Sequence, residues 1–199
     1  MKVIAATNNK GKVREFGEIL SPLGFEVVTL HEAGIYAEVE ETGNTFEENA
    51  LIKARSVALL CDAPVIADDS GLCVDALDGQ PGVLSARWAG ENATDADRIG
   101  KLLAELDGKE DRSAKFVSVV AFVDTDGSAI TAEGVVNGSI LYKPVGENGF
   151  GYDPIFFSSE LEKSFASATQ EEKNSVSHRG RALRALSEMI KSRSDKENN

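Results

Sequence analysis

The sequence is poor in cysteine, in basic residues and in long apolar runs, and each shortage excludes a class of protein. Cys61 and Cys73 form no C-x-x-C pair and have no neighbouring histidine, so we expect reduced thiols rather than a disulfide framework or a zinc site. No run of about 18 apolar residues occurs, so we expect no membrane-spanning helix. The start at Met1–Ala5 carries no signal-peptide pattern, which favours a cytoplasmic protein.

The charge balance excludes a further class. The formal net charge is −12, whereas binding along a nucleic-acid backbone needs a basic surface that releases counterions. We therefore expect no nucleic-acid partner. An acidic protein that handles an anionic substrate needs either a local basic pocket or a divalent cation.

The residues that are present have the composition of an ordinary globular domain, with 42% apolar and 27% charged residues. Short apolar runs at residues 3–6, 25–30 and 65–67 are typical of buried strands. Between them, residues 12–20 and 45–58 carry apolar side chains at helical spacing. This alternation of strand and helix predicts an α/β fold.

The second half of the chain has a different pattern of apolar and turn-forming residues. Strand-like runs at 115–124 and 129–136, joined by a glycine-containing turn, predict an antiparallel hairpin. Residues 137–159 are rich in Gly, Pro and Asn, so we expect a long loop, and such loops are usually functional. No repeat or linker divides the chain, so we expect one domain over residues 1–191 and a disordered tail over 192–199.

Three stretches carry residue types suited to chemistry, and the first is Thr7-Asn8-Asn9-Lys10-Gly11-Lys12. It lies at a strand-to-helix turn, where free backbone N–H groups and the helix dipole favour phosphate. It lacks the Walker A pattern, and a solvated helix cap is the plain alternative.

The second stretch is Asp68-Asp69-Ser70-Gly71, which follows the apolar run 65–67. Ligands in open α/β sheets bind beyond the carboxyl ends of strands, and two adjacent carboxylates there can hold a hard cation and accept a proton. Successive side chains on a strand point to opposite sides, so we expect one Asp to face the site and the other to support the backbone. A purely structural turn is the alternative.

The third stretch runs from Gly146 to Pro154 and contains Phe150-Gly151-Tyr152-Asp153. Its glycines allow a planar ring to approach the backbone, the aromatic side chains can stack on that ring, and Asp153 can accept ring N–H donors. Turn formation alone also explains such a composition. Downstream, His178-Arg179 can donate to a carbonyl or a phosphate.

Together these stretches resemble the inosine triphosphate pyrophosphatase family, which includes the dITP/XTP pyrophosphatases, and in particular its bacterial branch. The resemblance extends over nearly the whole chain except the tail. The matching pieces occur in family order: Thr7–Glu15, Glu40–Gly43 with Phe46–Ala54, Ala67–Leu72, Gly79–Trp88, Gly149–Phe156 and Ser177–Gly180.

The resemblance implies a two-lobed α/β fold around a long, mixed, curved sheet flanked by helices, with the active-site cleft between the lobes, and a homodimer. It implies Mg²⁺-dependent hydrolysis of ITP, dITP and XTP to the monophosphate and pyrophosphate, which removes them from the nucleotide pool. It makes Asp69 the proton acceptor and assigns Mg²⁺ to Glu40 and Asp69. The substrate-binding residues that it implies are Thr7, Asn8, Asn9, Lys10, Gly11, Lys12, Lys53, Ser70, Phe150, Gly151, Tyr152, Asp153, Lys173, His178 and Arg179.

Two other functions share parts of this pattern. A pyrophosphatase for pyrimidine or methylated nucleotides would carry Ser-Pro-Arg-Arg at the phosphate turn, where this chain has Asn8-Asn9-Lys10. A nucleotide sensor without hydrolysis would normally have lost a carboxylate, and Glu40, Asp68 and Asp69 are all present. The purine nucleotide hydrolase is the interpretation that the sequence favours.

Overall fold

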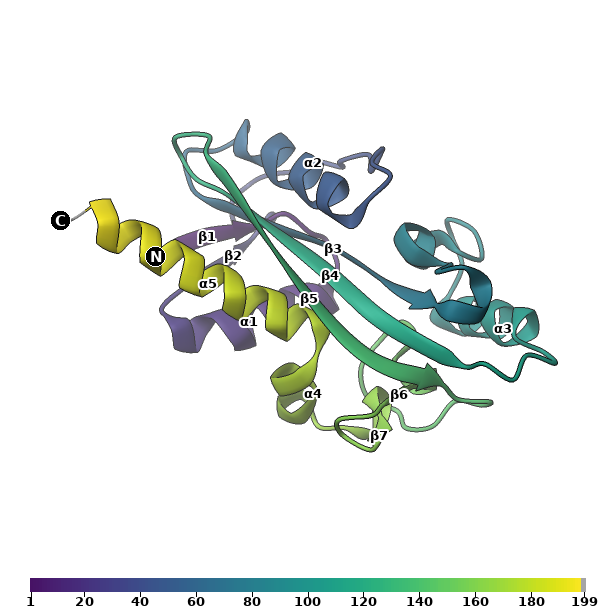
Figure 1. Cartoon of the computed structure of the whole chain (residues 1–199). Helices are drawn as coiled ribbons and strands as arrows, with labels where there is room; N and C mark the ends of the chain where they lie inside the picture. Colours follow the sequence, from purple (N-terminus) through teal and green to yellow (C-terminus); the bar gives the residue numbers. More distant parts are fainter. Residues whose placement is uncertain (198–199) are drawn as a thin grey trace. The chain divides into compact units, whose positions relative to one another are not determined.

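The computed structural model describes residues 1–197, with side chains described as far as Arg193. Its strands form a seven-stranded sheet in the order β2-β1-β3-β4-β5-β6-β7 (Figure 1). β1 runs parallel to β2 and β3, whereas β6 runs antiparallel to β5 and β7. The sheet is therefore mixed, and the predicted α/β class is confirmed. The strands are β1 (Lys2–Ala5), β2 (Glu26–Thr29), β3 (Val65–Val74), β4 (Ser113–Val123), β5 (Ala129–Ile140), β6 (Phe156–Ser158) and β7 (Lys163–Ser164).

One compact unit consists of residues 1–69, residues 118–134 and the C-terminal segment from Arg179 onward. In this unit α1 (Lys10–Leu20) and α5 (His178–Glu197) cover one face of the sheet, and α2 (Phe46–Ala58) covers the other (Figure 1). The alternation of β4 accounts for the two layers, because its successive side chains point to opposite faces. Val120 and Phe122 pack with α1 and α5. Val119 and Ala121 pack with α2.

The second unit consists of residues 70–117 and 135–178 and has its own apolar core. The rings of Phe116 and Phe165 lie 4.6 and 5.0 Å from the ring of Phe156. The helices of this unit are α3 (Asp95–Glu105) and α4 (Gln170–Val176), and each begins with a complete capping box. The short helical segments elsewhere in the chain are 3-10 turns, of which residues 82–87 form the longest.

Two strands are longer than their sequences predict. β3 does not end at residue 67 but continues to Val74, so the acidic stretch lies inside a strand and not in a turn. Buried ion pairs, described below, hold those carboxylates where an unpaired Asp would be costly. β5 extends to Ile140, which leaves 141–152 as the loop. Gly138 permits this extension, because a Cβ there would lie 2.2 Å from the carbonyl oxygen of Phe157 on β6.

Residues 192–197 continue α5, where the sequence predicts a disordered tail. Two contacts hold the helix at the start of this stretch. Ser192 Oγ donates to the carbonyl oxygen of Glu188, and Arg193 donates to Ser128 Oγ at 3.0 Å. Residues 198 and 199 lie outside the described residues. None of the helices in the described chain has the length and apolar character needed to cross a bilayer.

Candidate active site

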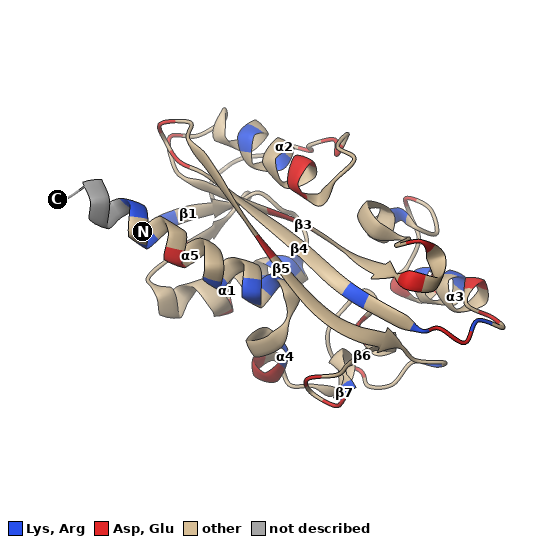
Figure 2. Cartoon of the chain, in the orientation of Figure 1, with Lys and Arg blue, Asp and Glu red and all other residues tan. Residues whose placement is uncertain are grey.

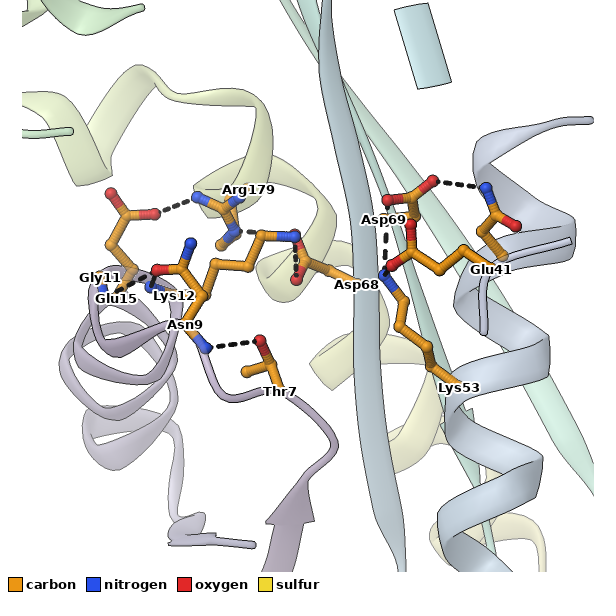
Figure 3. A network of polar contacts seen from close by, with 11 residues as sticks. Thr7, Asn9, Gly11, Lys12, Glu15, Glu41, Lys53, Asp68, Asp69 and Arg179 are labelled. Atoms are coloured by element: carbon orange, nitrogen blue, oxygen red, sulfur yellow. Dashed lines mark hydrogen bonds and ion pairs between the residues drawn. The ribbon is translucent and has the colours of Figure 1, made fainter. Parts of the chain in front are cut away.

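β3 places its two aspartates on opposite faces of the sheet, as Figure 3 shows. Asp68 points to the side of α1 and α5, and Asp69 points to the side of α2. Both are buried, with 1% and 5% of their surface exposed. The prediction that the two side chains point to opposite sides of the strand is confirmed. Asp68 contacts other side chains and does not support the backbone as predicted. The residues around β3 are called the Asp68–Asp69 cluster: Lys12, Glu15, Glu41, Lys53, Asp68, Asp69 and Arg179.

Asp68 is paired with two cations. Lys12 Nζ lies 3.0 Å from its Oδ1, and Arg179 Nε donates to its Oδ2 at 3.0 Å. Burial opposes the negative charge, but Lys12 and Arg179 outweigh it and hold the pKa of Asp68 far below its usual range. Asp68 therefore stays ionised and is unsuited to accept a proton.

Arg179 differs from its predicted role at the purine. Its side chain is 2% exposed and donates to both Asp68 and the fully buried Glu15 of α1 (Figure 3). Two carboxylates fix the planar guanidinium, because its fork of donors matches carboxylate oxygens. Arg179 therefore ties α5 to β3 and α1.

Asp69 has a different set of partners. Its Oδ1 lies 3.4 Å from Lys53 Nζ, and its Oδ2 accepts a hydrogen bond from Asn49 Nδ2 at 3.1 Å. Burial raises the pKa of Asp69 in spite of the lysines nearby. Burial would also neutralise Lys53, but the carboxylates of Asp69, Asp68 and Glu41 outweigh it and raise the pKa of that lysine. A buried carboxylate with a raised pKa beside a charged lysine suits a general base.

Glu41, the neighbour of the predicted Glu40, lies beside Lys53. Glu41 Oε1 lies 2.5 Å from Lys53 Nζ, whereas Glu40 is exposed to solvent. Adjacent side chains in a non-helical segment point in different directions, so only one of the two glutamates can face Lys53. Nothing in the sequence says which one does.

The donor set beside Asp69 fits a magnesium ion. Mg²⁺ commonly binds one or two protein carboxylates, and the rest of its ligands are waters and substrate phosphates. The Lys53 ammonium already lies between the carboxylates of Asp69 and Glu41, which shows that the place favours positive charge. Over the described part of the chain, no three His, Cys, Asp or Glu side chains gather into a closed metal site. An open site of this kind depends on the substrate to complete it.

The phosphate turn is capped by its own side chain. Asn9 Oδ1 accepts from the backbone N–H groups of Gly11 and Lys12, and Thr7 Oγ1 accepts from the N–H of Asn9 (Figure 3). A phosphate must therefore replace the Asn9 side chain at these amides or bind beside it. Lys10, at the exposed start of α1, is available to such a ligand.

The second unit holds a separate buried charge, called here the Lys173 cluster: Phe150, Asp153, Phe165 and Lys173. Lys173 is 3% exposed, and its Nζ donates to Asp153 Oδ2 at 2.6 Å. The same Nζ lies 4.7 Å from the centre of the Phe150 ring and 5.7 Å from that of Phe165. Asp153 Oδ2 also accepts from the backbone N–H of Phe150 at 2.9 Å. These contacts fix a half-exposed aromatic ring above a buried cation.

Gly149 makes this loop possible. Its φ is +78°, and a Cβ there would lie 2.1 Å from Asp153 Oδ2. No other residue allows Asp153 to fold back over the loop at this distance. The close approach of the Asp153 carboxylate therefore requires a glycine at this position. The sequence predicts a turn here but not this contact.

Two of the predicted base-binding residues lie in the core. Tyr152 is buried, its hydroxyl donates to the carbonyl oxygen of Ser85 at 3.0 Å, and burial raises its pKa. His178 is 4% exposed and stacks on Phe116 with ring centres 4.7 Å apart. The alternating glycines turn Tyr152 inward and leave Phe150 as the half-exposed aromatic of the stretch.

The sequence does not identify three polar residues that bind predicted site residues by hydrogen bonds or ion pairs. Glu15 holds Arg179, Asn49 holds Asp69, and Asp95 Oδ2 accepts from the N–H of Gly151 at 2.7 Å. Glu15 and Asn49 lie inside stretches that match the family, but the sequence pattern assigns no role to either residue. Burial of a polar residue on an apolar helix face is the signal that could have identified both.

The acidic residues are spread over helices, turns and strands (Figure 2). The net charge of −12 therefore coexists with a local group of buried cations at Lys12, Lys53 and Arg179. This is the arrangement that an acidic protein with an anionic substrate requires.

Several known proteins are similar to this chain over nearly its whole length. Residues 3–189 match the model of the Ham1 family. The chain is 50% identical over 191 residues to the dITP/XTP pyrophosphatase of Bacillus subtilis (strain 168), and the alignment covers 95% of this chain and 96% of that protein. The structure of the Staphylococcus aureus Ham1 protein matches with a TM-score of 0.86 at 42% identity, over 97% of this chain and 100% of that one. A nucleoside-triphosphatase / dITP/XTP pyrophosphatase from Mycobacterium abscessus matches with a TM-score of 0.74 at 48% identity, over 94% and 98% of the two chains.

Proposed function

The chain belongs to the Ham1 family, and from this premise we propose that it is a Mg²⁺-dependent pyrophosphatase of abnormal purine nucleoside triphosphates. Its substrates are ITP, dITP and XTP, and its products are the monophosphate and pyrophosphate. The observation that carries the proposal is the buried Asp69, beside Lys53 and Glu41, in a chain half identical to a dITP/XTP pyrophosphatase. We further propose a cytoplasmic homodimer, a state that light scattering of the purified protein tests.

Asp69 is the proton acceptor of the proposed reaction. Its raised pKa and its hydrogen bond from Asn49 favour an oriented carboxylate that takes a proton from the attacking water. Asp69 and Glu41 would hold the magnesium ion, which when bound neutralises phosphate charge and lowers the pKa of water. Lys53 and the exposed Lys10 stabilise charge that develops on the leaving pyrophosphate.

Phe150 supplies the platform for the purine. Its ring is half-exposed and is fixed from behind by Lys173 and Asp153, so it can stack on a base. Selection of hypoxanthine and xanthine over adenine requires hydrogen-bond donors that face the 6-oxo group. An adenine amino group would oppose donor to donor, and an unpaired buried donor is costly.

A panel of nucleoside triphosphates tests the proposal. Pyrophosphate release is measured with ITP, dITP, XTP, ATP and GTP, each with Mg²⁺ and with EDTA. We expect rapid release from the first three, much slower release from ATP and GTP, and none with EDTA. Equal turnover of ATP, or orthophosphate as the first product, would contradict the proposal.

A further inference from the structure

Asn49, in the second turn of α2, has a side chain that is 0% exposed and bonded at both ends. Its Oδ1 accepts a hydrogen bond from the backbone N–H of Gly43 at 2.8 Å. Its Nδ2 donates to Oδ2 of Asp69 at 3.1 Å. One amide therefore connects the segment after Glu41 to the aspartate on β3.

The direction of these two bonds is fixed by chemistry. A backbone N–H can only donate, so the amide oxygen of Asn49 must face Gly43. The amide nitrogen, which also can only donate, is then left to face Asp69, and Oδ2 of Asp69 must accept there. Rotation of the Asn49 amide by half a turn would place two donors together at Gly43 and two acceptors together at Asp69.

Gly43 lets the Asn49 amide approach the backbone this closely. A Cβ at position 43 would lie 2.7 Å from Oδ1 of Asn49. The next N–H along the chain, that of Asn44, donates to Glu48 Oε2 at 2.7 Å. Two neighbouring side chains of α2 thus fasten the same segment, and Asn49 contacts Asp69 as well.

We propose that Asn49 is a positioning residue for the pyrophosphatase reaction, which occupies Oδ2 of Asp69 and leaves Oδ1 as the oxygen that faces the reacting water. This inference rests on the proposed function. Oδ1 accepts a hydrogen bond from Lys53 Nζ at 3.4 Å, so the oxygen that Asn49 does not hold is on the charged side of the carboxylate. Without the amide, the carboxylate can rotate and the two oxygens lose their separate roles.

Steady-state kinetics of three variants test the role of Asn49. Misplacement of a catalytic group by about 1 Å can cost 10²-fold in rate, so we expect Asn49→Ala to lower kcat for ITP by about 10²-fold. Its KM should stay near the wild-type value, because the lost contact involves no substrate atom. Asn49→Asp keeps the shape but opposes two acceptors, and we expect at least as large a loss of kcat. Glu48→Ala releases the same segment without touching Asp69, so it should keep most of the wild-type kcat.

Binding of a non-hydrolysable ITP analogue, measured by calorimetry, shows that each variant is folded, and its dissociation constant should be unchanged in all three. An active wild type together with an Asn49→Ala variant that keeps its kcat would overturn the inference and leave the proposed function intact. An equal loss in Glu48→Ala would also overturn it, since Asn49 would then only hold the segment. A wild-type protein that releases no pyrophosphate would overturn the proposed function and this inference with it.

Discussion

The Asp68–Asp69 cluster and the Lys173 cluster both bury charge, but they hold it in different ways. In the first, β3, three helices and the loop that carries Glu41 contribute four carboxylates and three cations, and each group is oriented by groups of opposite sign. In the second, Lys173 is paired with Asp153 and also lies over the rings of Phe150 and Phe165. The first cluster is held by ion pairs, whereas in the second cluster aromatic packing also contributes.

The difference has an energetic consequence. A buried ion that loses its partner is costly, and the first cluster contains several ions that share partners. Loss of one member should therefore disturb the others. In the Lys173 cluster the ring faces also attract the ammonium, so the position of Phe150 depends on packing as much as on charge. Substitutions should separate the two cases.

The largest effect should come from Asp69→Asn. This change removes the proposed proton acceptor, and general-base catalysis contributes on the order of 10²–10⁴-fold, so kcat should fall by about that range while nucleotide still binds. Pyrophosphate release and calorimetry with ITP measure the two properties. Near-normal turnover would mean that Asp68 is the base, although its ion pairs with Lys12 and Arg179 disfavour its protonation.

Arg179→Met should have the largest effect on stability. It leaves Asp68 and Glu15 buried with one cation fewer, and breaking a buried pair costs about 3–5 kcal/mol in the free energy of unfolding. Urea denaturation measures the loss. The double variant with Glu15→Gln should recover part of it, because one unpaired charge is then removed. If the double variant recovers none of the lost free energy of unfolding, ion pairing is not what holds this cluster.

Phe150→Ala should test the other cluster through binding. Stacking of a base on an aromatic side chain contributes about 1–3 kcal/mol, so KM for ITP should rise roughly tenfold while the Mg²⁺ dependence stays the same. Phe150→Tyr keeps the ring and serves as the control. An unchanged KM in the alanine variant would mean that the ring does not contact the base.

The smallest effect should come from Asp95→Ala. It removes the hydrogen bond to the N–H of Gly151, which is worth about 1 kcal/mol, so KM should rise a few-fold with kcat unchanged. Asp97→Ala is the matched control on the same helix, because it opens the capping box but does not touch the loop. It should lower the melting temperature without changing KM. Equal KM values for both variants would mean that Asp95 does not hold the loop.

Local patterns in the sequence predict the elements well and the partners poorly. Apolar spacing at 12–20 and 45–58 predicts α1 and α2 correctly, because that signal lies within a few residues. The partners of Arg179 are 111 and 164 residues away, so no local pattern identifies Asp68 or Glu15. The apolar run that predicts the strand stops at residue 67, and the ion pairs of Asp68 and Asp69 with distant cations stabilise the strand beyond it.

The same limit applies to the aromatic stretch. Phe150 and Tyr152 are equivalent by composition, and the sequence predicts both as base-binding. The carboxylate that folds back over Gly149 decides which ring is half-exposed. A contact of that kind depends on side-chain geometry and not on residue type, so it becomes visible only in the structure.

The run of β3 through both aspartates makes this stretch intolerant of length changes. Because strand side chains alternate with a period of two, one inserted or deleted residue near Ala67 would exchange the faces of Asp68 and Asp69. The aspartate next to Lys53 would then point to Arg179, and the ion pairs on both faces of the strand would be broken although both carboxylates are still present.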